Sequence, residues 1–168
     1  MDKLAQTAPM SNEEQNEIEP PDLIGQLVAD DFQVERRLGQ GGMGQVYVAE
    51  QKSLARKVAL KILRPDVANN INARERFEVE ARAVASATHA NIVQVYAFGE
   101  WNGLLYMALE YVEGRNLRDF MTRKGPPDLL LALSILRQVA AALQRASEHE
   151  ITHRDIKPEN ILIKKKGE

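Results

Sequence analysis

H-R-D-I-K-P-E-N, residues 153–160, is the most informative segment of this sequence. It places Asp155, Lys157 and Asn160 within six positions on a polar stretch, which apolar residues 161–163 follow. A loop of this kind can bring a general base, a cation and a metal ligand to one point. Those are the groups that phosphate chemistry needs, so the segment predicts a site that handles phosphate.

Length and composition indicate a globular protein with one domain. The chain has 168 residues, of which 44% are hydrophobic, and this suffices for a substantial core. It has no cysteine, which excludes disulfides and thiolate zinc sites and fits a reducing compartment. No apolar run reaches the ~18–20 residues of a membrane-spanning helix, so we expect a soluble, cytoplasmic chain without a membrane segment.

Charge is distributed unevenly along the chain. Residues 1–31 carry eight acidic side chains, one lysine and no aromatic residue, so they cannot bury enough surface to offset the entropy of ordering. We predict a disordered acidic leader over residues 1–31. The remainder is modestly basic, which suits a nucleotide, although scattered surface lysines and arginines are the commoner cause of so small an excess. We expect no nucleic-acid partner.

After residue 31 the apolar pattern predicts five strands with one inserted helix, and then further helices. Asn102-Gly103 joins the last two strands and is typical of a tight hairpin. This order of elements indicates an α+β fold. The expected strands are 32–38, 46–50, 57–63, 92–98 and 104–109, and the expected helices are 72–87, 117–122 and 128–148.

A glycine-rich segment, L-G-Q-G-G-M-G-Q-V at residues 38–46, lies between the first two strands. Gly39, Gly41 and Gly44 would let backbone N–H groups approach phosphate oxygens, although glycines in a turn often serve backbone conformation alone. A Rossmann loop must open a helix, and a Walker A loop needs lysine and then serine or threonine after the last glycine. Neither fits, because residues 45–49 continue as a strand.

These segments, with V-A-L-K at residues 58–61, resemble the signatures of the protein kinase family, G-x-G-x-x-G-x-V, V-A-I-K and H-R-D-L-x-x-x-N. Leu60 and Ile156 are mild departures. The lysine two residues after the aspartate resembles serine/threonine kinases more than tyrosine kinases. The form G-G-M-G at residues 41–44 and the acidic leader look most like bacterial serine/threonine kinases of the eukaryotic type.

The resemblance implies a kinase-like α+β fold over residues 32–168. A small lobe, residues 32–112, would contain a five-stranded antiparallel sheet and one helix. Residues 113–168 would form the first helices of the large lobe. The activity implied is ATP-dependent phosphoryl transfer to serine or threonine of a protein, with ATP and Mg²⁺ as cofactors.

For the catalytic half, the resemblance assigns a role to each polar residue of the H-R-D segment. Asp155 would accept the proton of the substrate hydroxyl, Lys157 would contact the transferring phosphoryl group, and Asn160 would bind magnesium through its amide oxygen. His153 is expected to be a packed structural residue. Arg154 resembles kinases that depend on a phosphorylated activation loop.

For the nucleotide half, Lys61 would bind the α and β phosphates, although a lone strand lysine usually faces solvent. Its partner would be Glu80 of the helix, with Glu75 and Glu78 as alternatives. Leu109 would be the gatekeeper, next to a hinge that holds adenine. The resemblance implies that the nucleotide is surrounded by Leu38, Gly39, Gly41, Gly42, Gly44, Val46, Ala59, Lys61, Glu80, Glu110, Val112 and Leu162. The apolar residues of this set would serve equally well as part of the hydrophobic core.

The resemblance stops before one motif. The family places D-F-G a dozen or more residues after the asparagine, and only eight residues follow Asn160. We therefore expect a kinase fragment, truncated before D-F-G and inactive alone. The alternatives are a non-catalytic nucleotide-binding, pseudokinase-like regulatory module and an interaction remnant. Apolar residues of helix 128–148 would lose cover, so we expect marginal stability for the isolated chain.

Overall fold

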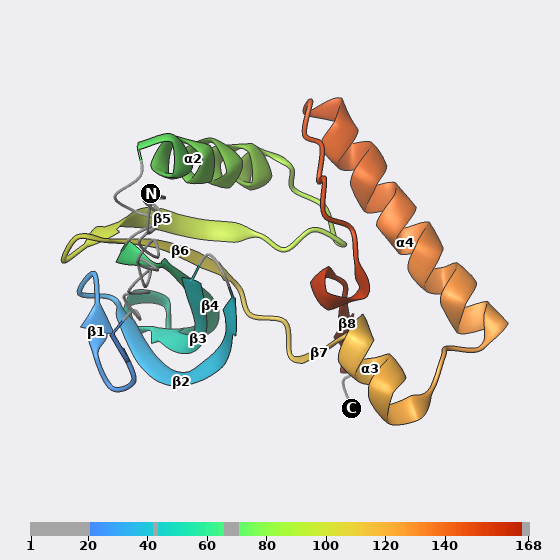
Figure 1. Cartoon of the computed structure of the whole chain (residues 1–168), viewed down its shortest axis with the longest axis horizontal. Coiled ribbons are helices and arrows are strands. Elements are labelled where there is room, and N and C mark those ends of the chain that lie inside the picture. The colour runs from blue at the N-terminus through green and yellow to red at the C-terminus, as the bar shows by residue number, and fades with distance from the viewer. Residues whose placement is uncertain (1–20, 42–43, 66–70, 166–168) are drawn as a thin grey trace, which may run out of the picture.

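The structure is a computed structural model that describes residues 21–41, 44–65 and 71–165 (Figure 1). Six strands form one antiparallel sheet in the order β1-β2-β3-β4-β6-β5. Its members are β1 (Leu27–Val28), β2 (Phe32–Gly41), β3 (Gly44–Gln51), β4 (Arg56–Leu63), β5 (Val95–Trp101) and β6 (Leu104–Glu110), and the short helix η1 (Lys52–Leu54) joins β3 to β4. The sheet curls, and α2 (Ile71–Ser86) lies along it beside β5 (Figure 1).

A second group of elements follows the sheet in the chain (right in Figure 1). Two short strands, β7 and β8, pair antiparallel and close a small ribbon. Between them run two helices and the H-R-D segment, so this ribbon brings the segment back to the point where the chain leaves the sheet. The elements are β7 (Gly114–Asn116), α3 (Leu117–Lys124), α4 (Leu129–Glu148), η2 (Pro158–Asn160) and β8 (Leu162–Lys164).

The predicted α+β architecture is confirmed, with a correction to the strand count. The expected five-stranded sheet has a sixth strand, β1, which pairs with the start of β2. The prediction of a disordered leader is wrong for residues 21–31, because Leu23 and Val28 are buried, with 2% and 0% of their surface exposed. The rest of the predicted leader, residues 1–20, lies outside the described residues.

Two hydrophobic clusters hold the sheet. The larger one joins Leu23 and Val28 of the N-terminal segment to residues such as Tyr47, Leu60 and Leu104 on four strands of the curled sheet. The second cluster lies under α2 and contains Leu63, Phe77, Ala81, Leu105 and Met107. One face of the sheet is therefore covered by α2, and the other is covered by Leu23 and Val28, which lie within the predicted leader.

Replacing Leu23 by alanine is expected to lower the free energy of unfolding by about 2–4 kcal/mol, because it leaves a cavity in the larger cluster. The control is Ile24→Ala, since Ile24 is 50% exposed and should cost less than about 1 kcal/mol. Urea unfolding can be followed by the fluorescence of Trp101, the single tryptophan, which packs against the same cluster. Equal losses for the two variants would contradict this role for residues 21–31.

The predicted hairpin is confirmed, and side chains cap the starts of two helices. Asn102 and Gly103 both have positive φ, 49° and 76°, as a two-residue turn between β5 and β6 requires. The Asn116 side chain accepts a hydrogen bond of 2.7 Å from Asp119 N at the start of α3. Asp128 caps α4 in the same way by accepting from Leu131 N at 2.8 Å.

The long helix α4 is largely uncovered, as the sequence predicts. Ile135 is its buried residue, whereas Leu133 and Leu136 are 54% and 63% exposed. Within the described residues α4 is also the helix that is long and apolar enough to cross a membrane. That criterion considers length and composition alone and is weak evidence, because core helices of soluble proteins meet it as well.

Candidate active site

The H-R-D segment brings Asp155, Lys157 and Asn160 together, as predicted. Lys157 Nζ lies 2.8 Å from Asp155 Oδ2. Asn160 Nδ2 donates to the backbone oxygen of Asp155 at 2.8 Å and to its Oδ2 at 3.0 Å. The carboxylate of Asp155 is thus held between a cation and an amide, and the segment runs between α4 and η2 on the right of Figure 1.

Backbone contacts hold this segment against the start of α3. Leu117 N donates to Ile161 O at 2.8 Å, and Asn116 pairs with Leu162 in the β7–β8 ribbon. Within η2, Asn160 N donates to Lys157 O at 2.9 Å. Position and orientation of the three polar residues are therefore set by main-chain hydrogen bonds as well as by their own side chains.

The charge state of the segment follows from these contacts. The hydrogen bond from Lys157 lowers the pKa of Asp155 below its ordinary value, with smaller contributions from Asn160 and His153 against desolvation. The same hydrogen bond raises the pKa of Lys157. Asp155 is therefore ionised and Lys157 protonated at neutral pH. The pair is lost as the pH falls through the lowered pKa of Asp155 or rises through the raised pKa of Lys157.

Replacing Lys157 by methionine is expected to raise the pKa of Asp155 toward its ordinary value, because the main cause of the lowering is removed. The measurement is an NMR titration of the Asp155 side-chain carboxyl carbon between pH 2 and 7. Lys124→Met on α3 removes one lysine elsewhere and serves as the control for net charge. An unchanged midpoint in the Lys157 variant would contradict the assigned ion pair.

His153 differs from the prediction in one respect. Its Nδ1 accepts a hydrogen bond from Asp155 N at 3.3 Å, which supports the segment, but the side chain is exposed rather than packed. His89 has a similar local role, since its Nδ1 accepts from Asn91 N at 3.1 Å. Arg154 is exposed and has a positive φ of 60°.

On the nucleotide side, the described residues of the glycine-rich segment form the end of β2 and the start of β3. Gly39 lies opposite Val46, and Gly41 lies opposite Gly44. Val46 in turn lies opposite Lys61, so the segment and the lysine sit on neighbouring strands. Gly42 lies outside the described residues, while Leu38 is 44% exposed at the start of the segment.

Lys61 is half-buried in the middle of β4 and points toward α2, since its Nζ lies 5.6 Å from the centre of the Phe77 ring. This side chain is not a solvent-facing strand lysine. The predicted partner, Glu80, lies on α2 one turn after Phe77, but its side chain is outside the described part of the structure. Of the alternatives, Glu78 is bonded to Arg74 at 3.3 Å, and Glu75 is exposed.

The residues predicted to hold adenine lie where the chain leaves the sheet. Glu110 N donates to Gln94 O at 2.8 Å, so a contact of Glu110 with adenine would have to use its carbonyl group. Val112 is half-buried in the connection that follows. Ala59 lies opposite Leu109 on β6, and Leu162 on β8 is 45% exposed.

Side chains also connect the sheet to the second group of elements. Asn91 Nδ2 donates to Gln138 Oε1 on α4 at 2.9 Å. Lys164 Nζ on β8 lies 3.2 Å from Glu110 Oε1 at the end of β6. These two contacts join the nucleotide half to the catalytic half in addition to the chain itself.

The oxygen donors of the H-R-D segment suit magnesium. Mg²⁺ is commonly held by one or two protein ligands together with phosphate oxygens and water. Asn160 offers its amide oxygen as such a ligand, since its Nδ2 is the atom that binds Asp155. Within the described residues no group of three or more acidic, histidine or cysteine side chains forms a separate metal site.

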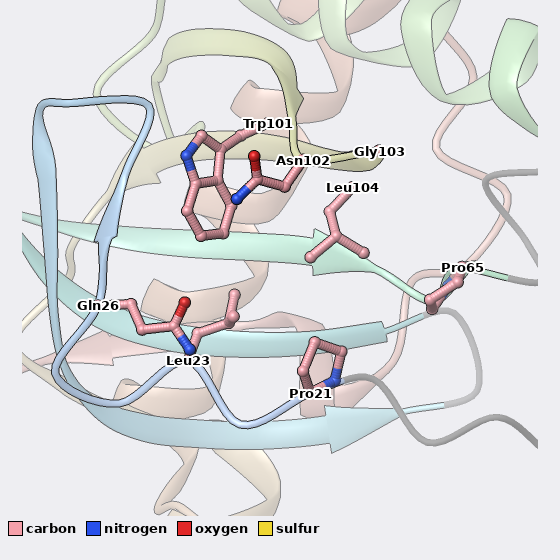
Figure 2. A pocket seen from close by; sticks show the side chains of 8 residues that line it. All are labelled: Pro21, Leu23, Gln26, Pro65, Trp101, Asn102, Gly103 and Leu104. Atoms are coloured by element: carbon pink, nitrogen blue, oxygen red, sulfur yellow. The ribbon is translucent and has the colours of Figure 1, made fainter.

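A pocket of about 380 Å³ lies elsewhere, at the end of the curled sheet (Figure 2). It is lined by Pro21, Leu23, Gln26, Pro65, Trp101, Asn102, Gly103 and Leu104. None of these residues belongs to the predicted nucleotide or catalytic set. We therefore assign this pocket to the junction of the N-terminal segment with the β5–β6 hairpin.

One contact of the H-R-D segment could not be anticipated. Arg118 Nε on α3 lies 2.9 Å from Glu159 Oε1 in η2. Glu159 stands inside the recognisable motif, but no local pattern marks Arg118, because 41 positions separate the two residues. Their pairing depends on the β7–β8 ribbon, which brings α3 beside η2.

Comparisons with known proteins agree with these observations. The family model for the protein kinase domain matches residues 32–168. The chain is 44% identical over 145 residues to the serine/threonine-protein kinase PrkC of Bacillus subtilis, covering 86% of this chain and 22% of that protein. It is 41% identical over 132 residues to PknD of Mycobacterium tuberculosis, covering 79% of this chain and 20% of that protein.

The fold has relatives among solved structures. The crystal structure of the Mycobacterium tuberculosis PknI kinase domain superposes with a TM-score of 0.75 at 32% sequence identity. The match covers 86% of this chain and 60% of that chain. The chain spans about a fifth of the length of the curated relatives it matches.

Proposed function

Because this chain belongs to the protein kinase family, we propose that it carries the nucleotide-binding part and the catalytic loop of a serine/threonine protein kinase. The reaction is transfer of the γ-phosphoryl group of ATP to a serine or threonine hydroxyl of a protein. The observation that carries the proposal is the Asp155, Lys157 and Asn160 cluster, with an ionised carboxylate at its centre. We place the reaction in the cytoplasm, in keeping with a chain that has no cysteine.

In the proposed mechanism, one residue acts on the substrate hydroxyl and three act on the phosphate groups of ATP. Asp155 orients the substrate hydroxyl and accepts its proton while the oxygen forms a bond to phosphorus and the bond to the β-phosphate oxygen breaks. Lys157 neutralises charge on the transferring oxygens. Lys61 binds the α and β phosphates. The amide oxygen of Asn160 would hold magnesium, which when bound would neutralise phosphate charge.

Asp155→Asn in the natural protein is expected to lower kcat by about 10²–10⁴-fold, because the proton acceptor is lost. The affinity for magnesium–ATP should remain close to that of the wild type, since Asp155 faces the substrate hydroxyl in this mechanism. The assay measures transfer of radiolabelled γ-phosphate to a protein substrate. A wild type with no more activity than this variant would instead support the pseudokinase-like module.

A polypeptide of residues 1–168 by itself is expected to bind magnesium–ATP but to transfer no phosphate above the Asp155→Asn background. The family takes its main magnesium ligand from D-F-G, which these residues do not contain. Transfer well above that background would show that the D-F-G aspartate is dispensable or replaced.

A further inference from the structure

Two buried polar side chains contact each other at the start of β3, on the face of the sheet away from Lys61. Gln45 and Tyr47 are 2% and 0% exposed, and the Tyr47 hydroxyl donates a hydrogen bond to Gln45 Oε1. Successive side chains of a strand point to opposite faces of the sheet. Val46 lies opposite Lys61 and shares its face, so the neighbours of Val46 on both sides point toward the hydrophobic cluster that contains Tyr47.

The N-terminal segment covers this pair from the same side. Leu23 and Val28 belong to the same hydrophobic cluster as Tyr47. The carbonyl oxygen of Pro21 lies 3.5 Å from the Tyr47 hydroxyl. The match to the kinase family model begins only at residue 32. Tyr47 is therefore held in part by residues that precede the family match.

A second set of contacts reaches the other strand of the glycine-rich segment. Arg37 lies opposite Tyr47, and its guanidinium carbon is 5.8 Å from the centre of the Tyr47 ring. Its Nη2 lies 3.4 Å from Asp22 Oδ1, and its Nη1 donates to Gln40 Oε1 at 3.4 Å. Gln40 in turn lies opposite Gln45. The paired residues Arg37 and Tyr47 thus each contact one of the two paired glutamines.

We propose that Tyr47 is a positioning residue, which holds the glycine-rich segment from the face opposite the nucleotide through its hydrogen bond to Gln45. This inference rests on the proposed function, in which the segment belongs to the ATP site. A buried amide without a partner is costly, so Gln45 is favoured where the hydroxyl reaches it. Gln45 directly follows Gly44, so fixing its side chain restrains the strand at the phosphate site.

Two variants separate positioning from simple stability. Tyr47→Phe keeps the ring in the cluster but leaves Gln45 Oε1 without this donor, which should lower stability as well. Gln45→Met/Tyr47→Phe replaces both partners by apolar groups of similar shape, which should restore most of the stability. The double variant still lacks the hydrogen bond. A purely structural role therefore predicts recovery of stability and nucleotide affinity together, whereas positioning predicts recovery of stability alone.

The first measurement is amide hydrogen exchange of the 168-residue chain without nucleotide. In Tyr47→Phe and in the double variant, the protected amides of residues 44–46 should exchange about 3–10-fold faster relative to residues 58–60 on β4, as expected for one lost hydrogen bond. Tyr106→Phe is the matched control. Tyr106 packs against the same cluster, but it lies on β6, and β4 separates that strand from β3. Its loss of a hydroxyl should leave the exchange of residues 44–46 unchanged.

The second measurement is calorimetric titration of the same variants with magnesium–ATP. Tyr47→Phe and the double variant should bind about 3–10-fold more weakly than the wild type, and Tyr106→Phe should bind within about two-fold of it. The proposal is overturned if the double variant regains wild-type exchange or wild-type affinity, or if Tyr106→Phe reproduces the effects of Tyr47→Phe.

A failure of the proposed function would be recognised separately, by a wild type and a Lys61→Ala variant that bind magnesium–ATP alike. The exchange measurement uses no nucleotide, so in that case it still decides whether Tyr47 holds the glycine-rich segment. Unchanged exchange of residues 44–46 in both Tyr47 variants would show that it does not.

Discussion

Lys61→Ala should weaken magnesium–ATP binding by about 10–100-fold, because charge-assisted hydrogen bonds to phosphate contribute about 1.5–3 kcal/mol. The structure gives Lys61 the position that this role needs. It lies opposite Val46, the last residue of the glycine-rich segment, and its Nζ points toward α2 rather than into solvent. Calorimetric titration of the 168-residue chain with ATP in the presence of Mg²⁺ measures the effect.

The control is Lys57→Ala on the same strand. Lys57 Nζ is 3.3 Å from Glu35 Oε2, and its side chain is 59% exposed. It lies opposite Glu50 at the far end of β3, away from the glycine-rich segment. Its replacement should change the dissociation constant by less than about two-fold, as expected for an exposed ion pair. If the Lys61 and Lys57 variants bind alike, Lys61 is not the phosphate ligand.

Gly44→Ala should lower the free energy of unfolding by about 3 kcal/mol, since a methyl group has no room at this position. A Cβ atom built on Gly44 collides with the carbonyl oxygen of Ile62 on β4 and lies 3.0 Å from its carbonyl carbon. The obstacle is backbone, which cannot rotate away as a side chain can. The strands β3 and β4 would have to separate where Gly44, the first residue of β3, lies opposite Leu63.

Gly39→Ala is the matched control, because a Cβ at Gly39 meets nothing within 4 Å. Urea unfolding should place the two variants far apart, and the melting temperature of the Gly44 variant should fall by about 6–12 °C. Equal stability of the two variants would show that β3 and β4 adjust at no cost. Glycine is thus required at position 44 because β3 and β4 pack closely there, whichever ligand the glycine-rich segment binds.

The parts of the site that the sequence predicts well are local. Asp155, Lys157 and Asn160 fall within six positions, and a short loop can bring such residues together without help from distant elements. The predicted hairpin at Asn102-Gly103 is local as well. In these cases the chemistry of one or two residues determines the backbone conformation.

The parts that sequence reasoning missed depend on distant partners. Leu23 and Val28 are two apolar residues in an acidic stretch, and their burial follows from the residues of β3, β4 and β6 that they contact. Arg118 and Glu159 meet across 41 positions through the β7–β8 ribbon. Local composition cannot predict the burial of Leu23 and Val28 or the Arg118–Glu159 ion pair. In each case the stabilising contact is made with a residue that is distant in the sequence.

Two side-chain links described above connect the small lobe to the elements after it. One is the exposed Asn91–Gln138 hydrogen bond, and the other is the Lys164–Glu110 ion pair, in which the lysine side chain is 66% accessible. Exposed polar contacts of this kind contribute little to stability. These two links by themselves therefore oppose a change in the separation of Lys61 from Asp155 only weakly.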